Sequence, residues 1–220
     1  MSDIVIFGIG DYGRIAHLYL QRDSPHDVVA FTVHRDYADR DELNGLPVIP
    51  YEELAERHPP GDVSMLVATG FSKVNQVRAG IYEQCKQDGY DFISYVNSGA
   101  MVWHDVPIGE NTFIFEANVV QPGVSIGNDV VLWSGNHIGH DTTIGDHVFI
   151  ASHVVVSGNC TIQDNCFVGV NATFRDGITV APRCVIGAGA LVMKDTEEGD
   201  VLSVPGTKPY RLKSWELRGF

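Results

Sequence analysis

The sequence predicts a small α/β unit over residues 1–97, followed by a parallel β-helix over residues 98–220. Two patterns predict this division. Strand-like and helix-like segments alternate in the first half, which is typical of a parallel sheet with helices packed against it. In the second half an apolar residue recurs at every sixth position without a gap. The chain has 220 residues, 44% of them hydrophobic, and can therefore bury a core in each part.

The first half contains four strand-like segments and three helical ones. The expected strands are residues 3–7, 28–33, 64–69 and 90–95, and the expected helices are a run through Ala16, Leu18 and Leu20 and residues 50–57 and 71–87. This alternation predicts a small parallel sheet of the Rossmann type. We expect the boundary to the second half between residues 97 and 103.

Gly8, Gly10 and Gly13 match the G-x-G-x-x-G pattern between the first strand and the first helix, which favours phosphate binding at a helix N-terminus. A dinucleotide site also needs an acid at the end of the second strand, but that strand ends in His34 and the nearest acid is Asp36. We therefore favour a sugar nucleotide or a similar phosphate. NAD(P) and a purely structural glycine turn remain the alternatives.

The second half repeats with a period of six. The apolar anchors are Ile108, Ile114, Val120, Ile126, Leu132, Ile138, Ile144, Ile150, Val156, Ile162, Val168, Phe174, Val180, Ile186 and Val192. The residue after an anchor is often small, and the fourth residue after it is mostly small or β-branched. This predicts a triangular β-helix with three hexapeptides per coil, five coils from Ile108 to about Glu197, and a rise of about 4.8 Å per coil. Anchors and fourth-following residues should point inward, and the small second residue should occupy the sharp turn.

Three of the four cysteines occupy the inward fourth position of a repeat. These are Cys160, Cys166 and Cys184, and the chain has no C-x-x-C pair. We interpret them as small buried apolar residues rather than redox groups or metal ligands.

The chain is acidic, with a formal net charge of −13. Nucleic acid and anionic membrane are therefore not expected as partners, because both repel an acidic surface. The N-terminal residues lack the basic segment of a secretory signal, and no apolar stretch reaches the roughly 18 residues that span a bilayer. We expect a cytoplasmic protein without membrane insertion.

Histidines concentrate in the middle coils, at His137, His140, His147 and His153. A coil of three hexapeptides places His140 under Gly158, Asp141 under Asn159 and His153 under Asn171. We expect the bare backbone of Gly158 above His140 to leave room for a ligand along this groove. A carboxylate next to an imidazole fixes its tautomer and raises its basicity, so His140 with Asp141 is the candidate catalytic pair. Solvated histidines without function and a zinc site that includes His137 and His140 are the alternatives.

The stretch IGHDTTIGDHVFIASHVVVSGNCTI, together with CFVGVNATFRDGITVAPRCVIGAGALV, resembles the left-handed β-helix acyltransferases. The two-part layout is similar to the sialic-acid O-acetyltransferase-like and PglD-like sugar acetyltransferases. The resemblance implies a left-handed β-helix, a homotrimer, and acetyl-CoA bound in a groove between two copies. It also implies His140 as general base, with its basicity increased by Asp141, and direct attack of a sugar amine or hydroxyl on the thioester.

The resemblance further implies binding residues in both halves. Gly158, Val170 and Ala188 would contact coenzyme A, and Gly10, Asp11, Tyr12 and Gly70 would contact the substrate phosphates. The chain departs from the pattern in two places. Phe149 occupies a position nine residues after the base that is often polar in the family, and His147 and His153 are the candidates for that polar role. Val33 and His34 replace the acidic pair that UDP-binding relatives carry.

The sequence therefore predicts an acyltransferase that transfers the acetyl group of acetyl-CoA to a sugar or a nucleotide-linked sugar in glycoconjugate biosynthesis, without a metal. Two alternatives remain at this point. One is a trimeric metal-binding protein of the carbonic-anhydrase type, with His137, His140 and His153 as ligands. The other is a β-helix that serves only as a scaffold.

Overall fold

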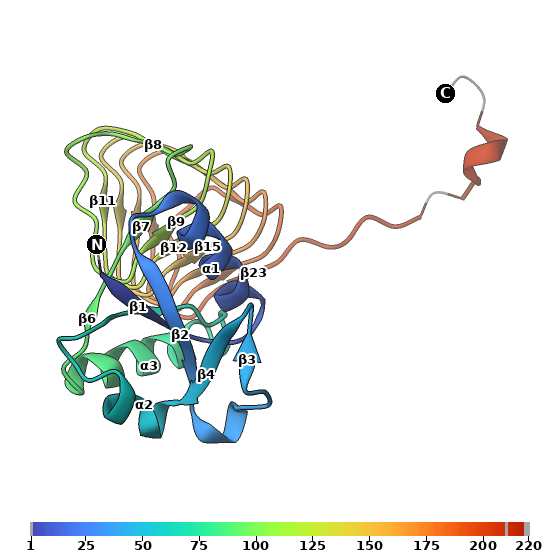
Figure 1. The fold of residues 1–220 in the computed structure, drawn as a ribbon. Coiled ribbons are helices and arrows are strands. Elements are labelled where there is room, and N and C mark those ends of the chain that lie inside the picture. The colour runs from blue at the N-terminus through green and yellow to red at the C-terminus, as the bar shows by residue number, and fades with distance from the viewer. Residues whose placement is uncertain (1, 210, 218–220) are drawn as a thin grey trace.

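A computed structural model describes residues 2–209 and 211–217 (Figure 1). The α/β unit lies against one side of the β-helix, and the chain after the last coil runs outward as an extended segment (Figure 1). That segment contains one short helical turn, η2 (Ser214–Glu216).

The α/β unit is a six-stranded sheet in the order β3-β4-β2-β1-β5-β6. Its strands are β1 (Asp3–Phe7), β2 (Asp27–Val33), β3 (Glu42–Leu43), β4 (Leu46–Pro50), β5 (Ser64–Val67) and β6 (Asp91–Phe92), and its helices are α1 (Asp11–Asp23), η1 (Arg35–Tyr37), α2 (Tyr51–Arg57) and α3 (Gln76–Gln87). All neighbouring strands are parallel except the pair β3 and β4. The small parallel sheet is thus confirmed, and two strands were not predicted.

Helix α3 begins at Gln76 rather than at the predicted residue 71. Lys73, Val74 and Asn75 have φ angles of 50°, 53° and 64°. These left-handed conformations cannot continue into a right-handed helix. The Asn75 side chain is fully buried, and its amide donates to the Cys166 carbonyl at 2.9 Å. The turn before α3 is therefore shaped by contact with the β-helix.

The second half winds into three parallel sheets, in which each strand pairs with the equivalent strand of the next coil, as Val131 does with Phe149. The seven-stranded sheet contains β7 (Tyr95–Val96), β9 (Phe113–Ile114), β12 (Val131–Leu132), β15 (Phe149–Ile150), β18 (Phe167–Val168), β21 (Val185–Ile186) and β23 (Val201–Leu202). The six-stranded sheet contains β8 (Met101–Val102), β10 (Val119–Val120), β13 (His137–Ile138), β16 (Val155–Val156), β19 (Thr173–Phe174) and β22 (Leu191–Val192). The four-stranded sheet contains β11 (Ser125–Ile126), β14 (Thr143–Ile144), β17 (Thr161–Ile162) and β20 (Thr179–Val180).

The predicted inward positions are confirmed. Every anchor from Ile114 to Val192 is buried, and Ile108 is half-buried. The fourth-following residues from Thr112 to Ala190 are buried as well, including Cys160, Cys166 and Cys184, whereas Thr196 is half-buried. A narrow core of alternating large and small side chains therefore fills the β-helix.

The prediction of the turn residue was wrong. Positive φ angles occur three residues after an anchor, as at Asp141 (56°) and Gly123 (75°), and not at the small residue directly after it. That small residue has another role: a Cβ on Gly139 would lie 2.6 Å from the backbone of Ser157 and Gly158 in the next coil. Small side chains are needed there because successive coils approach closely.

The winding is longer than the predicted five coils. β7 pairs with β9, and β23 pairs with β21, so that the β-helix extends from Tyr95 to Leu202. The predicted strand 90–95 is divided between the two sheets: β6 pairs with β5 in the α/β unit, and β7 belongs to the β-helix. The division at residue 97 stays a prediction, and the first strand of the β-helix precedes it.

The α/β unit covers the outer face of the seven-stranded sheet. Phe113 contacts Tyr12 and Tyr19 in edge-to-face geometry, at ring distances of 5.9 and 6.4 Å. Further along the sheet, Phe71 contacts Phe149 at 5.3 Å. This aromatic junction fixes the α/β unit at the face of the triangle that the seven-stranded sheet forms.

Candidate active site

Three columns of loops form the corners of the triangle, and each corner has its own residues. The His140 corner lies between the six- and four-stranded sheets and comprises residues 121–124, 139–142, 157–160, 175–178 and 193–196. The Val170 corner lies between the seven- and six-stranded sheets and comprises residues 115–118, 133–136, 151–154, 169–172 and 187–190. The Asp129 corner lies between the four- and seven-stranded sheets and comprises residues 127–130, 145–148, 163–166 and 181–184.

His140 and Asp141 form the predicted pair on the His140 corner. The Nδ1 atom of His140 lies 2.9 Å from Oδ2 of Asp141, and the imidazole is about half exposed. An imidazole whose Nδ1–H donates to a carboxylate presents the lone pair of Nε2. The main-chain N–H of His140 donates to Oε1 of Gln121 at 2.9 Å. The pair is thus oriented and open to a ligand.

Glycines above and below make room for this pair. A Cβ on Gly158 would lie 2.5 Å from Nε2 of His140, which confirms that Gly158 is directly above it. The space over Gly158 is filled by the imidazole itself, whereas we expected it to be free for a ligand. A Cβ on Gly123, one coil below, would collide with Oδ1 of Asp141. Neither side chain could keep its position if these glycines were larger.

The predicted substrate-binding residues come together in a pocket of about 730 Å³. Gly10, Asp11, Tyr12 and Gly70 all line it, at the carboxyl ends of β1, β2 and β5. Parallel sheets bind ligands at this edge. A Cβ on Gly10 would meet nothing within 4 Å, so that a ligand can reach the backbone at the N-terminus of α1.

Aromatic side chains surround this pocket, and its cationic groups are few. Tyr37 and Phe71 are exposed, and Trp133 reaches it from the Val170 corner. His34, which replaces the acidic pair of UDP-binding relatives, also lines it. Its Nδ1 lies 3.1 Å from Oε1 of Glu52. Burial raises the pKa of the Tyr12 phenol well above its usual value, so Tyr12 presents a neutral hydroxyl.

The predicted coenzyme residues lie on two different corners. Gly158 is on the His140 corner, whereas Val170 and Ala188 are exposed on the Val170 corner. The six-stranded sheet separates these two corners in one chain. The pocket lined by Gly10 and Gly70 likewise adjoins the Val170 corner through Trp133 and not the His140 corner. One copy of the chain therefore does not bring all predicted site residues together.

The other histidines of the middle coils are dispersed. His137 lies on the outer face of the six-stranded sheet, and His153 is exposed on the Val170 corner. His147 lies on the Asp129 corner, where its Nδ1 is 2.9 Å from Oδ2 of Asp129 at the junction with α3. Phe149 is buried in the aromatic junction. Within residues 2–209 and 211–217, no group of three or more His, Cys, Asp or Glu side chains is arranged to hold a metal ion.

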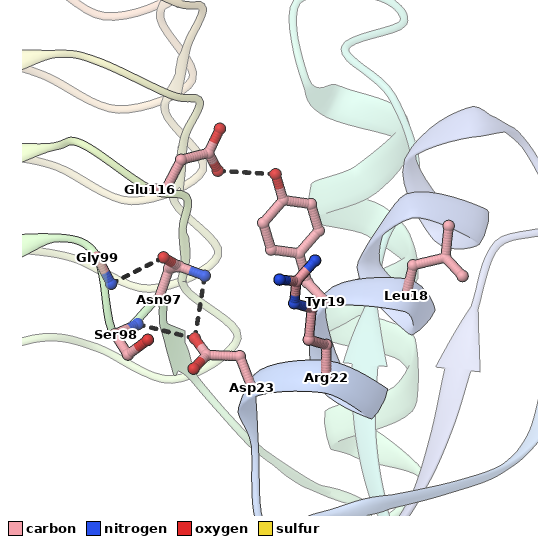
Figure 2. Close-up of a pocket in the computed structure, with 8 residues that line it drawn as sticks. All are labelled: Leu18, Tyr19, Arg22, Asp23, Asn97, Ser98, Gly99 and Glu116. Carbon is pink, nitrogen blue, oxygen red and sulfur yellow. Dashed lines mark hydrogen bonds between the residues drawn. The ribbon is translucent and has the colours of Figure 1, made fainter.

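A second pocket of about 550 Å³ opens between α1 and the first coils (Figure 2). Tyr19 donates to Glu116 at 2.7 Å, and Oδ2 of Asp23 accepts bonds from Asn97 and the main chain of Ser98 (Figure 2). Oδ2 of Asp23 also accepts a bond from the Tyr95 hydroxyl. These polar groups bind one another across the junction. We interpret the pocket as part of the contact between the two units.

Sequence reasoning missed Gln121, Gly123 and Trp133. The length of one coil places Gly123 under Asp141, and this signal was present in the sequence. Gln121 and Trp133 carry no signal of their own, because only the packing of coils and units brings them to the site.

Among the described residues, no helix is both long and apolar enough to cross a membrane. Residues 123–158 and 159–194 match the family model "Bacterial transferase hexapeptide (six repeats)". A comparison with curated protein sequences gives no match.

Several solved structures share the whole architecture. A histidine-to-asparagine mutant of perosamine N-acetyltransferase from Caulobacter crescentus, with CoA and GDP-perosamine, has a TM-score of 0.83 at 20% identity over 91% of this chain and 93% of that one. The acetyltransferase domain of PglB from Neisseria gonorrhoeae FA1090, with acetyl coenzyme A, has a TM-score of 0.78 at 24% identity over 90% and 94%. WeeI from Acinetobacter baumannii AYE has a TM-score of 0.76 at 19% identity over 91% and 96%. The chain therefore has the fold of these proteins, in which a Rossmann-like half domain is followed by a left-handed parallel β-helix of hexapeptide repeats.

Proposed function

We propose that this protein is an acyltransferase that transfers the acetyl group of acetyl-CoA to an amino or hydroxyl group of a sugar or a nucleotide-linked sugar. The observation that carries the proposal is the His140–Asp141 pair, exposed on a corner of the β-helix against the bare backbone of Gly158. The solved structures with the same fold that contain CoA, acetyl coenzyme A or GDP-perosamine support it.

The geometry supports general base catalysis. Nε2 of His140 takes the proton from the sugar amine or hydroxyl while that group attacks the thioester carbonyl. The carbon–sulfur bond then breaks, and the imidazolium returns the proton to the leaving thiolate. Asp141 stabilises the imidazolium through Nδ1. The main-chain N–H of Gly158 donates to no protein acceptor within the described residues and can stabilise the oxyanion.

The active protein in this proposal is a homotrimer formed through the six-stranded sheet. The outward side chains of that sheet are Met101, Val119, His137, Val155, Thr173 and Leu191. Met101 and Leu191 are 70% and 64% exposed in the single chain, an unusual state for large apolar residues on a flat surface. The outward residues of the four-stranded sheet are Ser125, Thr143, Thr161 and Thr179, which suit contact with water.

A threefold arrangement around this sheet completes the site. The six-stranded sheet is flanked by the His140 corner on one side and by the Val170 corner on the other. When three such faces surround an axis, the His140 corner of one copy meets the Val170 corner of the next. The base at His140 would then face Val170, Ala188 and the nucleotide pocket of the neighbouring copy. Coenzyme A binds in the cleft between them.

The proposal places Gly10, Asp11, Tyr12 and Gly70 around the phosphates of a nucleotide-linked sugar, next to Trp133. The sugar would extend from this pocket toward the neighbouring His140. Such a reaction belongs to the biosynthesis of surface glycans and takes place in the cytoplasm, where acetyl-CoA is available.

The test is a thiol-release assay with acetyl-CoA and a panel of UDP-, GDP- and dTDP-linked amino sugars. We expect release of free coenzyme A with at least one of these acceptors, and retention of the activity after treatment with a chelator. Activity that disappears with chelation, together with a bound metal ion at one per cleft, would favour the metal-binding alternative. Absence of heat with acetyl-CoA in calorimetry and of any stabilisation in a thermal melt would favour the scaffold.

A further inference from the structure

A half-exposed tryptophan lies at the N-terminal end of the His140 corner. Trp103 directly follows β8, one coil below Gln121, and its indole is 50% exposed in the single chain. Met101, which faces outward from the six-stranded sheet beside it, is 70% exposed. The positions equivalent to Trp103 in the later coils are Gln121, Gly139, Ser157, Arg175 and Met193. This corner therefore carries an aromatic side chain in that column at one height.

The pocket between α1 and the first coils has features that suit an indole (Figure 2). Its volume of about 550 Å³ lies within the range of pockets that take small ligands. Leu18 of α1 lines it and is 46% exposed. Asn97 and the main chain of Ser98 donate to Oδ2 of Asp23, which leaves Oδ1 free of the residues drawn in Figure 2. An indole buried here would find apolar surface and an acceptor for its N–H.

Trp103 cannot reach the pocket of its own chain. The pocket lies next to the Val170 corner, where Gly99 and Glu116 line it, and α1 packs on the seven-stranded sheet through Tyr12 and Tyr19. The His140 corner joins the six- and four-stranded sheets, so that it is the vertex opposite the seven-stranded sheet. Contact between the indole and this pocket therefore requires two copies of the chain.

The repeat places Trp103 at the height of this pocket. Val119 pairs with Met101, so that one coil takes 18 residues and rises about 4.8 Å. Trp103 follows Gly99 by four residues and precedes Glu116 by 13, which places it about 1 Å above the former and about 3.5 Å below the latter. Copies in a cyclic trimer are related by rotation without a shift along the axis. Where the His140 corner of one copy meets the Val170 corner of the next, Trp103 therefore faces the pocket of the neighbouring copy.

We infer that Trp103 of each copy inserts into the pocket between α1 and the first coils of the neighbouring copy, and that this contact anchors the trimer. This inference rests on the homotrimer of the proposed function. The indole packs on Leu18 of the neighbouring copy, and its N–H donates to Oδ1 of Asp23 there. Each copy supplies one tryptophan and one pocket, so that the trimer contains three identical contacts.

The charges beside the two surfaces are complementary. Arg22 is exposed at the rim of the pocket, and Asp105 is exposed two residues after Trp103. Opposite charges therefore meet where the indole enters, and a buried aromatic anchor within a polar rim is the usual form of an interface hot spot. The contact lies about two coils below His140 and is separate from the proposed catalytic pair.

The first test is a covalent link between copies. The variant Leu18→Cys with Trp103→Cys is treated with a short bifunctional maleimide, and the four native cysteines are buried. We expect covalent trimers in denaturing electrophoresis. The matched control is Leu18→Cys with Arg175→Cys, which moves the second thiol four coils up the same column, roughly 19 Å away, and should stay unlinked. Absence of the link in the first variant, or equal linking in both, would overturn the inference.

The second test measures the strength of the assembly. Trp103→Ala should raise the concentration at which half of the trimers dissociate at least about tenfold, as expected for truncation of an interface hot spot. Trp215→Ala removes a tryptophan that is 81% exposed on the C-terminal segment and should match the wild type. Sedimentation velocity over a dilution series provides the measurement, and circular dichroism checks the fold of each variant.

The outcomes separate this contact from the rest of the proposed function. A trimer of unchanged strength in Trp103→Ala overturns the contact and leaves the homotrimer in place. A wild type that sediments as a monomer overturns both. Neither test measures release of coenzyme A, so that the proposed reaction stands or fails by the thiol-release assay alone.

Discussion

Arg78 of α3 and Asp129 of the β-helix lie far apart in the sequence, and their side chains form a completely buried ion pair with Nε and Oδ1 3.0 Å apart. Asp129 also accepts bonds from Asn111 at 2.7 Å and from His147 at 2.9 Å. The guanidinium donates further to the carbonyls of Asp129 and His147. This network joins the two units of the chain at one point.

Arg78→Met should destabilise the protein by about 3–5 kcal/mol, because it leaves the Asp129 carboxylate buried without its partner. The unfolding temperature should fall by roughly 10 °C. The double variant Arg78→Met with Asp129→Asn should lose less than the single variant, because asparagine carries no charge. Thermal melts of the three proteins provide the measurement, and a double variant that is less stable than Arg78→Met would contradict the interpretation.

His140→Ala should reduce kcat about 10²- to 10⁴-fold, the usual contribution of a positioned base. The matched control is His104→Ala, which removes a histidine with an adjacent aspartate from the same corner two coils below. This control should keep wild-type activity. Steady-state kinetics and a melting curve for each variant separate catalysis from folding. Activity of the His140 variant within about threefold of wild type would refute the assignment of the base.

Gly123→Ala should impair catalysis by displacing Asp141, because the new Cβ collides with its carboxylate. Gly177→Ala is the matched control. It lies three coils higher on the same corner with nearly the same φ angle, 72° against 75°, and its Cβ would meet nothing within 4 Å. Both variants carry the same backbone strain, so a larger loss of kcat in Gly123→Ala reports on the carboxylate. Equal kcat values would mean that Asp141 need not be held in place.

The stability of the protein should depend on pH through the contact between α1 and the first coils (Figure 2). Burial alone would raise the pKa of Glu116, but hydrogen bonds from Ser134 and Tyr19 outweigh it and hold the pKa below the usual 4.5. Hydrogen bonds from Ser98 and Tyr95 likewise lower the pKa of Asp23. A carboxyl with a depressed pKa contributes stability that is complete above its unfolded pKa and is lost as the pH falls through the folded value.

We therefore expect a constant unfolding temperature at neutral pH and a decline below about pH 4.5. Glu116→Gln should start from a lower stability and decline less. Glu83→Gln, which removes an exposed carboxyl from α3, is the control and should follow the wild type. Melts from mildly acidic to neutral pH measure this dependence, and parallel curves for Glu116→Gln and wild type would exclude the contribution of Glu116.

Val155→Asp should dissociate the proposed trimer, because it introduces a charge in the middle of the six-stranded sheet. Thr143→Asp places the same charge on the four-stranded sheet and should leave the assembly intact. Sedimentation velocity gives the mass of each variant. If Val155→Asp sediments like the wild type, the interface is elsewhere.

The repeat was predictable because the inward positions of a narrow β-helix accept only a few types of side chain. The apolar anchors from Ile114 to Val192 follow this restriction and are all buried. The turn position was misassigned, although the sequence carried the signal. Asn, Asp and Gly recur three residues after the anchors, at Asn111, Asp129, Asn159 and Gly177 for example, and these residues tolerate left-handed backbone. Glycine directly after an anchor reflects close approach of coils, a different constraint.

Three other features of the structure were not predicted, each for a separate reason. The hairpin of β3 and β4 turns at Asn44 and Gly45, both with positive φ, so a recognisable hairpin signal was overlooked. The pairing of Arg78 with Asp129 depends on how the two units pack and has no local signature. The separation of Val170 from His140 follows from the repeat itself, because the interval between them is not a whole number of coils.

Successive coils of the β-helix have the same rise, so that equivalent residues of the His140 corner lie at equal intervals along it. Inserting or deleting one whole coil between His140 and Lys194 changes the distance between them by the rise of one coil and keeps both residues on the same edge of the triangle. A change of a single hexapeptide rotates Lys194 to another edge of the triangle. In a chain of this design, the distance between two residues of the same corner can therefore change only in steps of one whole coil.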